Sequence, residues 1–368
     1  GQFGCTSLWF AGNAILKDLT LSYSLPEAAI GYITSSVQFG FIIGTLIFAL
    51  LTIADRFSPS RVFLTSAILG AVLNAALLIP KHDLYSILCL RFLVGVCLAG
   101  IYPVGMKIAS DYYGKGLGKS LGYLVGALVL GTAFPHLLKG FQIGLSWQSI
   151  LIITSSLALV GGILIALLGD GPHRKAAYKF DASTLLTVFK IPAFRSAAFG
   201  YWGHMWELYA FWAFLPLIIS SYLPGFNISL WSFLTIAIGS LPCILGGYLS
   251  SALGAKKVAT IALVISGICC LVAFPVLNSS LIWLKPTLLL IWGIAVIMDS
   301  PMFSTLVAQN APNENKGTAL TIVNSVGFLI TIFSIQLLNS LVMITESPVI
   351  YSVLGIGPIL GLIALWRR

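Results

Sequence analysis

The stretch Asp170–Arg195 reads DGPHRKAAYKFDASTLLTVFKIPAFR and is more polar and more basic than the sequence on either side of it. Six apolar runs precede it and six follow it, most of them near or above the ~20 residues that a helix needs to cross a bilayer. Period-2 alternation, which a membrane-spanning barrel would need, is absent. We therefore predict an all-α membrane protein with an N-terminal six-helix bundle (1–169), a cytoplasmic linker (170–195) and a C-terminal six-helix bundle (196–368).

Composition agrees with lipid as the solvent of these runs. Of 368 residues, 58% are hydrophobic and 8% are charged, whereas a soluble domain carries about 25% charged residues. The twelve runs are predicted at 1–19, 28–53, 60–80, 86–111, 117–138, 147–169, 196–223, 229–252, 257–277, 282–309, 317–343 and 348–366. We expect a few further residues before Gly1, because the first run begins there without Met, and nothing resembles a signal peptide.

The basic residues are distributed unevenly between the two ends of the predicted helices. One side consists of the loops that follow the even-numbered runs, together with the C-terminus, and it holds 15 of the 20 Lys and Arg residues. These are Arg56, Arg61, Lys107, Lys115, Lys119, Arg174, Lys175, Lys179, Lys190, Arg195, Lys256, Lys257, Lys316, Arg367 and Arg368. The other side holds four, namely Lys17, Lys81, Lys139 and Lys285. Because cytoplasmic loops are enriched in Lys and Arg, we predict that both termini are cytoplasmic in a cell inner membrane.

Charge and cysteine usage exclude several classes of protein. The net charge of +9 comes from basic residues in short loops, with no contiguous basic face, so no nucleic-acid partner is predicted. The six cysteines lie in apolar segments without CxxC spacing, which indicates small buried side chains and neither a metal site nor a disulfide framework. No phosphate loop, HExxH or GxSxG motif is complete, so we predict no enzyme activity and no cofactor.

The two halves share sparse features in the same order when the chain is shifted by about 200 residues. The aligned pairs are Gly1 with Gly200, Gly4 with Gly203, Gly95 with Gly293, Pro103 with Pro301, Lys115-Gly116 with Lys316-Gly317, and Gly126 with Gly327. Chance matching of common residues is the alternative. Parallel six-helix repeats place the substrate path at the repeat interface, near the middle of the membrane.

The loop after the second run reads ADRFSPSRVFL and resembles the pattern G-x-x-x-D-R-x-G-R-[RK] of the major facilitator superfamily. Asp55, Arg56 and Arg61 resemble its charged positions, while Leu51 and Ser58 stand where glycines are expected. The resemblance implies a gating loop, in which arginines pair with the acid and hold the two halves together in one state. Membrane-orienting anchors are the alternative for the two arginines.

Other segments carry further parts of the resemblance. The loop after the eighth run reads GGYLSSALGAKK and matches the pattern at Gly247, Gly254, Lys256 and Lys257, with Ser251 in place of the aspartate. RFLVG, from Arg91 to Gly95, resembles the family's R-x-x-x-G element, and Gly122, Gly126, Gly131 and Pro135 partly resemble its antiporter pattern without a Gly-Pro pair. No arginine lies in the second or eighth run, where nitrate carriers have one, so we do not expect nitrate.

Three charged residues lie inside predicted helices that, as the resemblance implies, line a central cavity: Arg91, Glu207 and Asp299. A charge at the bilayer centre costs at least ~2.5–3.5 kcal/mol, so each needs a role. We predict that Glu207 and Asp299 bind and release a proton as access alternates, and that Arg91 contacts a substrate carboxylate. A static intramembrane ion pair is the alternative.

Polar and aromatic neighbours complete the predicted substrate-binding or proton-coupling set. His204 lies three residues before Glu207 and can exchange protons near neutral pH, with a hydrogen-bonded core histidine as the alternative. Trp206 and Tyr209, with Trp202 and Trp212, recur around Glu207 and are candidates for an aromatic wall or for lipid-facing packing. Two residues in the N-terminal half, Gln38 and Asn13, are candidates for hydrogen bonds to substrate or between helices.

We predict a monomeric secondary transporter of a small organic solute, coupled to protons and working by alternating access within the lipid bilayer. The alternatives are an efflux antiporter for amphipathic or cationic compounds, which the aromatic seventh run favours, and a non-transporting membrane receptor or scaffold. Buried acids without an evident structural need argue against the latter.

Overall fold

The computed structural model describes the chain except residues 113–116, 142–144, 175–187, 313–315 and 367–368, together with a few further side chains. Within the described ranges every regular element is a helix, which confirms the predicted all-α membrane fold. Ten of these helices are long and apolar enough to cross a membrane. The first and seventh predicted runs lie outside that set: the first is broken into short helices, and the seventh, α12 (Pro192–Tyr222), carries buried polar groups.

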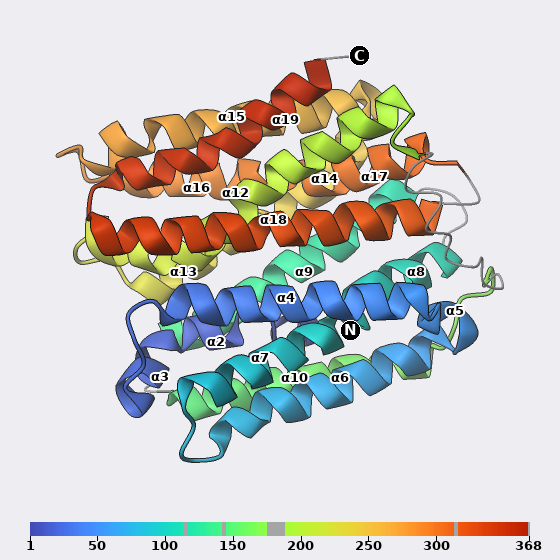
Figure 1. The fold of residues 1–368 in the computed structure, drawn as a ribbon, viewed down its shortest axis with the longest axis horizontal. Coiled ribbons are helices and arrows are strands. Elements are labelled where there is room, and N and C mark those ends of the chain that lie inside the picture. Colours follow the sequence, from blue (N-terminus) through green and yellow to red (C-terminus); the bar gives the residue numbers. More distant parts are fainter. Residues whose placement is uncertain (113–116, 142–144, 175–187, 313–315, 367–368) are drawn as a thin grey trace. The chain divides into compact units, whose positions relative to one another are not determined.

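In the N-terminal half (Figure 1) the first predicted run is three short helices and the fourth is two, while the other runs begin and end within a few residues of helices. They are α1 (Gln2–Thr6), α2 (Ala11–Ala14), α3 (Leu16–Tyr23), α4 (Ala29–Leu50), α5 (Ile53–Arg56), α6 (Pro59–Ala75), η1 (Ala76–Leu78), α7 (Leu84–Ala99), α8 (Tyr102–Tyr112), α9 (Leu117–Gly140) and α10 (Trp147–Leu168). Local chemistry explains two of the starts. Pro59 occupies the first turn of α6 behind the N-cap Ser58, and Asp83 and Ser86 form a capping box at α7.

The helices of the C-terminal half after α12 follow the same pattern. They are α13 (Ile228–Ala237), α14 (Ser240–Leu253), α15 (Ala255–Leu277), α16 (Leu284–Met298), α17 (Ser300–Asn310), α18 (Lys316–Ile344), η3 (Pro348–Gly355) and α19 (Ile356–Trp366). The tenth predicted run is divided at Asp299, two residues before Pro301. Because proline lacks an N–H and disfavours the helix before it, a buried acid lies at a break in a membrane helix.

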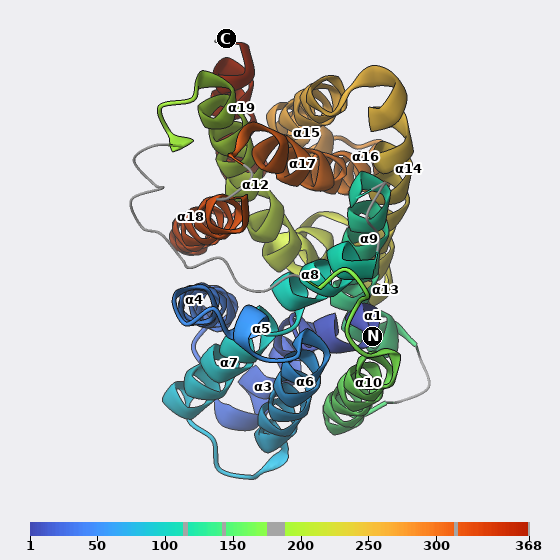
Figure 2. The same cartoon turned by 90° about the vertical axis from the view of Figure 1, so that its right-hand side faces the viewer.

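The chain forms two compact units. Unit 1 consists of Gly1–Ser120, Ala127–Ala177 and Asn227–Phe233, and unit 2 consists of Leu121–Gly126, Tyr178–Phe226 and Leu234–Arg368. In unit 2, α12 packs along both α18 and α19, as the two perpendicular views agree (Figures 1 and 2). The boundaries at 169 and 195 remain a prediction.

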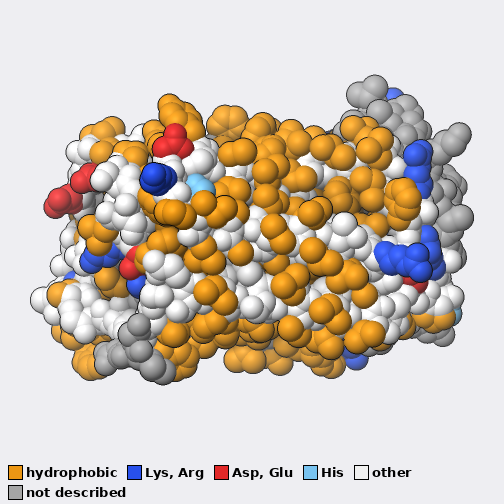
Figure 3. Space-filling model, turned by 90° about the horizontal axis from the view of Figure 1, so that it is seen from below, with side chains coloured by type: hydrophobic (Ala, Val, Ile, Leu, Met, Phe, Trp, Pro, Cys, Tyr) orange, Lys and Arg blue, Asp and Glu red, His pale blue; other side chains and the backbone are white. Residues whose placement is uncertain are grey.

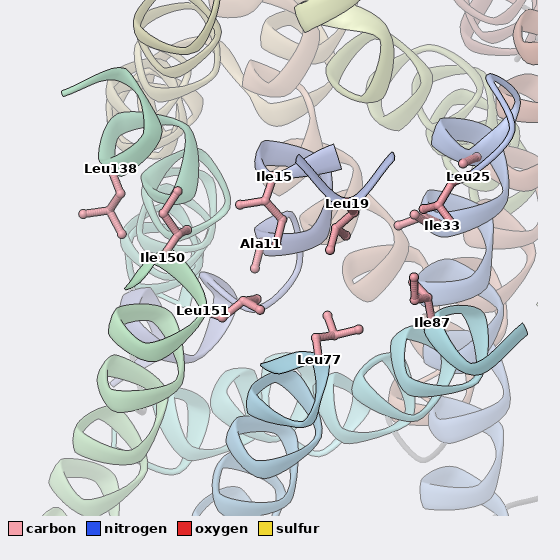
Figure 4. Packing of buried hydrophobic residues seen from close by; sticks show 11 residues of the cluster. Ala11, Ile15, Leu19, Leu25, Ile33, Leu77, Ile87, Leu138, Ile150 and Leu151 are labelled. Carbon is pink, nitrogen blue, oxygen red and sulfur yellow. The ribbon is translucent and has the colours of Figure 1, made fainter. Parts of the chain in front are cut away.

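Unit 1 has a buried cluster of aliphatic side chains around its broken first helix (Figure 4). Ala11, Ile15 and Leu19 of the broken helix face Leu77 and Ile87. Leu25, Ile33, Leu138, Ile150 and Leu151 complete the cluster. Close packing of this kind is what holds helices together where lipid removes most of the hydrophobic driving force.

The outer surface has the pattern of a membrane protein. Figure 3 shows one face on which hydrophobic side chains cover the middle, while Lys, Arg, Asp and Glu side chains lie toward the two ends. Large apolar side chains are exposed on many of the helices, for example Leu167 at 79% and Phe333 at 61%. Such exposure is stable against lipid tails, so these faces are the lipid-contacting surface.

Candidate functional site

The most unusual polar group of unit 2 is the carboxylate of Glu207, in the middle of α12. Its side chain is 1% exposed and points at α15 and α16. Ser266 Oγ donates to Oε2 at 2.9 Å, Cys270 Sγ donates to Oε1 at 3.3 Å, and the indole Nε1 of Trp292 also donates to Oε1. Three donors and no described counter-cation therefore surround this carboxylate.

Stacking holds the indole donor of Glu207 in place. The rings of Trp292 and Phe211 are 4.3 Å apart between centroids and almost parallel, at 17°. Phe211 lies on α12, one turn after Glu207. The ring that stacks on Trp292 therefore belongs to the same helix as the carboxylate that Trp292 binds. Offset stacked rings are a favourable arrangement, which makes the indole a rigid donor.

The second buried acid, Asp299, pairs with His204. Asp299 Oδ1 lies 2.7 Å from His204 Nδ1, and both side chains are only 1% exposed. His204 is on α12 and Asp299 is at the break between α16 and α17, so the pair joins two elements 95 positions apart. The two atoms lie within ion-pair distance, and the contact is a salt bridge only when the imidazole carries a proton.

His204 therefore partners Asp299, although its position three residues before Glu207 had suggested a relay with that acid. Its ring also lies near Tyr201 and Phe303, with centroids 5.8 and 6.3 Å away. Its Nε2 has no hydrogen-bond partner among the described residues. The arrangement leaves one nitrogen of the ring available for a proton while the other is held by the acid.

The four aromatic residues near Glu207 do not form one wall around it. Trp202 Nε1 donates to the carbonyl of Val323, and Trp206 Nε1 donates to that of Val353, so both indoles point toward α18, η3 and α19. Tyr209 packs against Trp212 and Phe328, and Trp212 is fully buried. The physical reason is helical geometry: positions 202, 206 and 209 share one face of α12, whereas Glu207, one position after Trp206, faces another way.

In unit 1, Arg91 of α7 is completely buried and is held by the break in the first helix. Its Nη2 donates to the carbonyls of Leu8 and Trp9, at 2.8 and 2.6 Å, and these residues lie between α1 and α2. Its Nη1 donates to Asn74 Oδ1 at 3.1 Å. Within the described part of the chain the guanidinium forms no salt bridge, so the arginine–acid pair weighed as an alternative is not seen.

Asn74 extends this network to α10. Its Nδ2 donates to Thr154 Oγ1 at 3.2 Å and to Ser155 Oγ at 3.0 Å. The amide thus links the broken first helix, α6, α7 and α10 through Arg91. Gly12 lies against the same guanidinium, because a Cβ there would be 3.1 Å from Nε.

The two other predicted polar residues of unit 1 differ from each other. Asn13 Nδ2 donates to Thr34 Oγ1 at 2.6 Å, which joins α2 to α4. Gln38 of α4 is 0% exposed, and neither atom of its amide has a hydrogen-bond partner among the described side chains and backbone. Gln38 is therefore the candidate whose hydrogen-bonding capacity is open to a ligand.

The predicted gating loop is anchored within unit 1 by residues outside the predicted set. Arg56 and Arg61 are exposed at the end of α5 and the start of α6, and the side chain of Asp55 lies outside the described residues. Ser58 Oγ donates to Asp170 Oδ1 at 2.9 Å, and Arg174 binds Asp170 Oδ2 at 2.9 Å.

The same carboxylate accepts from the backbone and side chain of Ser60. Partial burial opposes ionisation of Asp170, but the donated bonds of Ser60 and Ser58 and the charge of Arg174 hold the pKa of its carboxyl below the ordinary value. Ser58, which stands where the resembled loop pattern has glycine, thus helps to hold Asp170 in place.

Several residues that contact the buried acids could not have been selected as site residues from the sequence. Ser266, Cys270 and Trp292 sit in apolar runs where such residues are common, and only the folded chain turns them toward Glu207. Asn74 could have been selected as a polar residue within an apolar run. No cluster of three or more His, Cys, Asp or Glu side chains suitable for a metal ion is found in the described ranges.

Comparisons with known proteins agree with this architecture. A family model described as Major Facilitator Superfamily matches residues 1–335. The niacin transporter NiaP of Acinetobacter baylyi is 30% identical over 159 residues, which is 37% of this chain and 36% of that protein. The chain thus aligns with little more than a third of that relative's length.

Solved structures resemble the whole chain in fold. A bacterial homolog of the human lysosomal transporter Spinster, in its inward-facing and occupied conformation, superposes with a TM-score of 0.70 at 14% identity, over 100% of this chain and 93% of that one. Its inward-facing and unoccupied conformation gives 0.69 at 14% identity, over 99% and 91%. At such identities the likeness concerns the fold alone.

Proposed function

The chain belongs to the major facilitator superfamily and is a membrane transporter rather than an enzyme, and from this we propose that it carries a small organic solute by alternating access, coupled to protons. In this proposal the monomer lies in a cell inner membrane with both termini in the cytoplasm, and its two bundles rock about a central site.

The single observation that carries the proposal is the contact of Asp299 with His204. A carboxylate and an imidazole 2.7 Å apart, both 1% exposed, form a site for one exchangeable proton inside a membrane-spanning unit. Asp299 lies at a break between two helices, where a small rotation of either segment changes the distance. A change of conformation would then change the proton affinity of the pair.

Glu207 supports the proposal from the same helix. Its carboxylate accepts bonds from neutral donors, so binding a proton would neutralise it without breaking an ion pair. Buried ionisable groups without structural necessity are expensive, which favours a functional use. In this proposal Asp299 binds its proton together with the imidazole of His204, whereas Glu207 binds its proton without a basic partner.

Niacin is the first ligand to test, because a relative with 30% identity over part of its length is a niacin transporter. Proton release or uptake by the purified protein in weak buffer would be followed with a pH indicator while niacin, other organic acids, amines and sugars are added in turn. Binding would be followed in parallel by the shift in thermal unfolding.

Glu207→Gln and Asp299→Asn are the informative variants, and Glu27→Gln is the matched control at an exposed acid. We expect a ligand-dependent proton signal in the wild type and in the control, and its loss in at least one of the two buried variants. Binding without a proton signal, unchanged in both variants, would overturn coupling and leave a uniporter. A proton signal with amines in place of acids would favour the antiporter for cationic compounds.

A further inference from the structure

A groove of about 700 Å³ in unit 2 is lined by residues of α12, α18 and α19. These three helices lie side by side in Figures 1 and 2. Its lining is almost wholly apolar and includes Phe199, Trp202, Trp206, Phe333 and Leu360. None of the groups that bind protons in the proposal above lines it, so it is a separate site.

Two glycines lie where α12 and α19 meet beside the groove. Gly203 of α12 and Gly357 of α19 both line it, and a Cβ on Gly203 would lie 2.4 Å from the carbonyl oxygen of Gly357. The two helices therefore touch backbone to backbone there, as small residues allow. The indole N–H groups of Trp202 and Trp206 are both used on backbone carbonyls, which leaves their apolar ring surfaces for an occupant.

The groove opens toward the lipid-contacting surface. Phe199, Phe333 and Leu360 on its walls are 44%, 61% and 59% exposed. In a membrane protein, exposed apolar walls at this depth meet acyl chains. A hydrocarbon chain therefore fits the middle of the groove better than a polar solute does.

Among the described residues that line the groove, one is a cation, and it lies at one end. Arg195 is in the first turn of α12, three residues after the helix begins at Pro192, which also lines the groove. Its Nη1 donates to the carbonyl of Phe189 at 2.9 Å, which holds the guanidinium beside the start of α12. A guanidinium binds phosphate oxygens well because its planar fork matches their geometry.

We propose that this groove binds one phospholipid with an anionic head group, its acyl chain lying over Trp202 and Trp206 and its phosphate at Arg195. The lipid would be a structural ligand of the C-terminal helices, bound outside the solute path. This proposal does not rest on proton coupling and can fail or succeed independently of it.

Native mass spectrometry of the detergent-purified protein tests the proposal with phosphatidylglycerol and phosphatidylethanolamine added in equal amounts. We expect a retained phosphatidylglycerol molecule in the wild type. Arg195→Gln should reduce the preference for phosphatidylglycerol about fivefold, since one basic residue near an anionic lipid contributes ~1 kcal/mol. Lys257→Gln, at an exposed lysine outside the groove, is the matched control and should leave the preference unchanged.

A second variant tests the groove itself. Ala364→Trp places a large ring among the lining residues and should reduce retention of both lipids, while its elution and melting profiles report that the protein is folded. Equal retention of both lipids that neither variant changes would overturn the proposal. Loss of the head-group preference in Lys257→Gln as well as in Arg195→Gln would show that the preference comes from the general positive charge of the surface, and this would also overturn the proposal.

Discussion

At the scale of single residues, two buried amide side chains of unit 1 differ in their hydrogen bonding. Asn74 uses its amide on Arg91, Thr154 and Ser155, whereas Gln38 has no described partner for either amide atom. An unsatisfied buried polar group costs about 1–3 kcal/mol, and such groups persist where function needs them. Among the polar residues of this half that the sequence predicts for the site, Gln38 therefore remains a candidate for binding a ligand.

Gln38→Met and Asn74→Leu form a matched pair of amide-to-apolar changes. We expect Gln38→Met to keep or raise thermal stability, because it removes an unpaired amide, and to weaken solute binding. Asn74→Leu should lower the free energy of unfolding by about 1–3 kcal/mol, because Arg91 loses an acceptor. Thermal unfolding and ligand binding of the purified variants would measure both. A strong loss of stability in Gln38→Met would instead assign this glutamine a structural hydrogen bond.

At the scale of elements, helix breaks and glycine contacts place the functional groups. The break between α1 and α2 presents the carbonyls of Leu8 and Trp9 to Arg91, and the break before α17 positions Asp299 for His204. Close contact of α12 with α19 at Gly203 fixes the helix that carries Glu207 and His204. Breaking that contact would therefore disturb both acid sites together.

Gly203→Ala should destabilise the protein by about 1–3 kcal/mol, because its Cβ meets the backbone of Gly357 at 2.4 Å and the helices must separate. Gly246→Ala, in α14, is the matched control, since the nearest atom to its Cβ would be 3.6 Å away. That control should be neutral or slightly stabilising, because alanine favours helix by up to ~1 kcal/mol. Melting temperatures of the two variants in detergent would compare them, and the reverse order would contradict this account of the α12–α19 contact.

At the scale of the whole molecule, the asymmetry of basic residues predicts its orientation. From the count of 15 against four basic residues we predict that the C-terminus and the stretch 170–195 lie on the same side of the membrane. The same asymmetry predicts that the loop near Ser280, between α15 and α16, lies on the opposite side. Orientation follows from charge, because loops rich in Lys and Arg are retained in the cytoplasm.

Reporter fusions measure this orientation. Alkaline phosphatase, active only outside the cytoplasm, should be inactive when fused after Arg368 and active when fused after Ser280. Green fluorescent protein at the same two positions is the reciprocal control and should fluoresce only after Arg368. An active phosphatase at the C-terminus would reverse the predicted orientation.

How far the sequence predicts the site differs between its residues. Glu207, Asp299 and Arg91 could be selected because a charge in an apolar run is costly and therefore conspicuous. The partners of Glu207 could not be selected, since Ser266, Cys270 and Trp292 are ordinary residues of apolar runs. The backbone carbonyls that Arg91 contacts could not be selected either, because every residue has one.

The sequence by itself determined the helices and their class. The run predicted at 147–169 is α10 (Trp147–Leu168), and the run at 257–277 is α15 (Ala255–Leu277). Such bounds follow from local properties, because apolar length, proline and capping residues act within a few positions. Only the tertiary structure decided that His204 meets Asp299 and that Gly203 meets Gly357 beside the groove along α12. Those contacts join residues about a hundred or more positions apart, and helix rotation, which sets which side chains face each other, is decided by packing between helices.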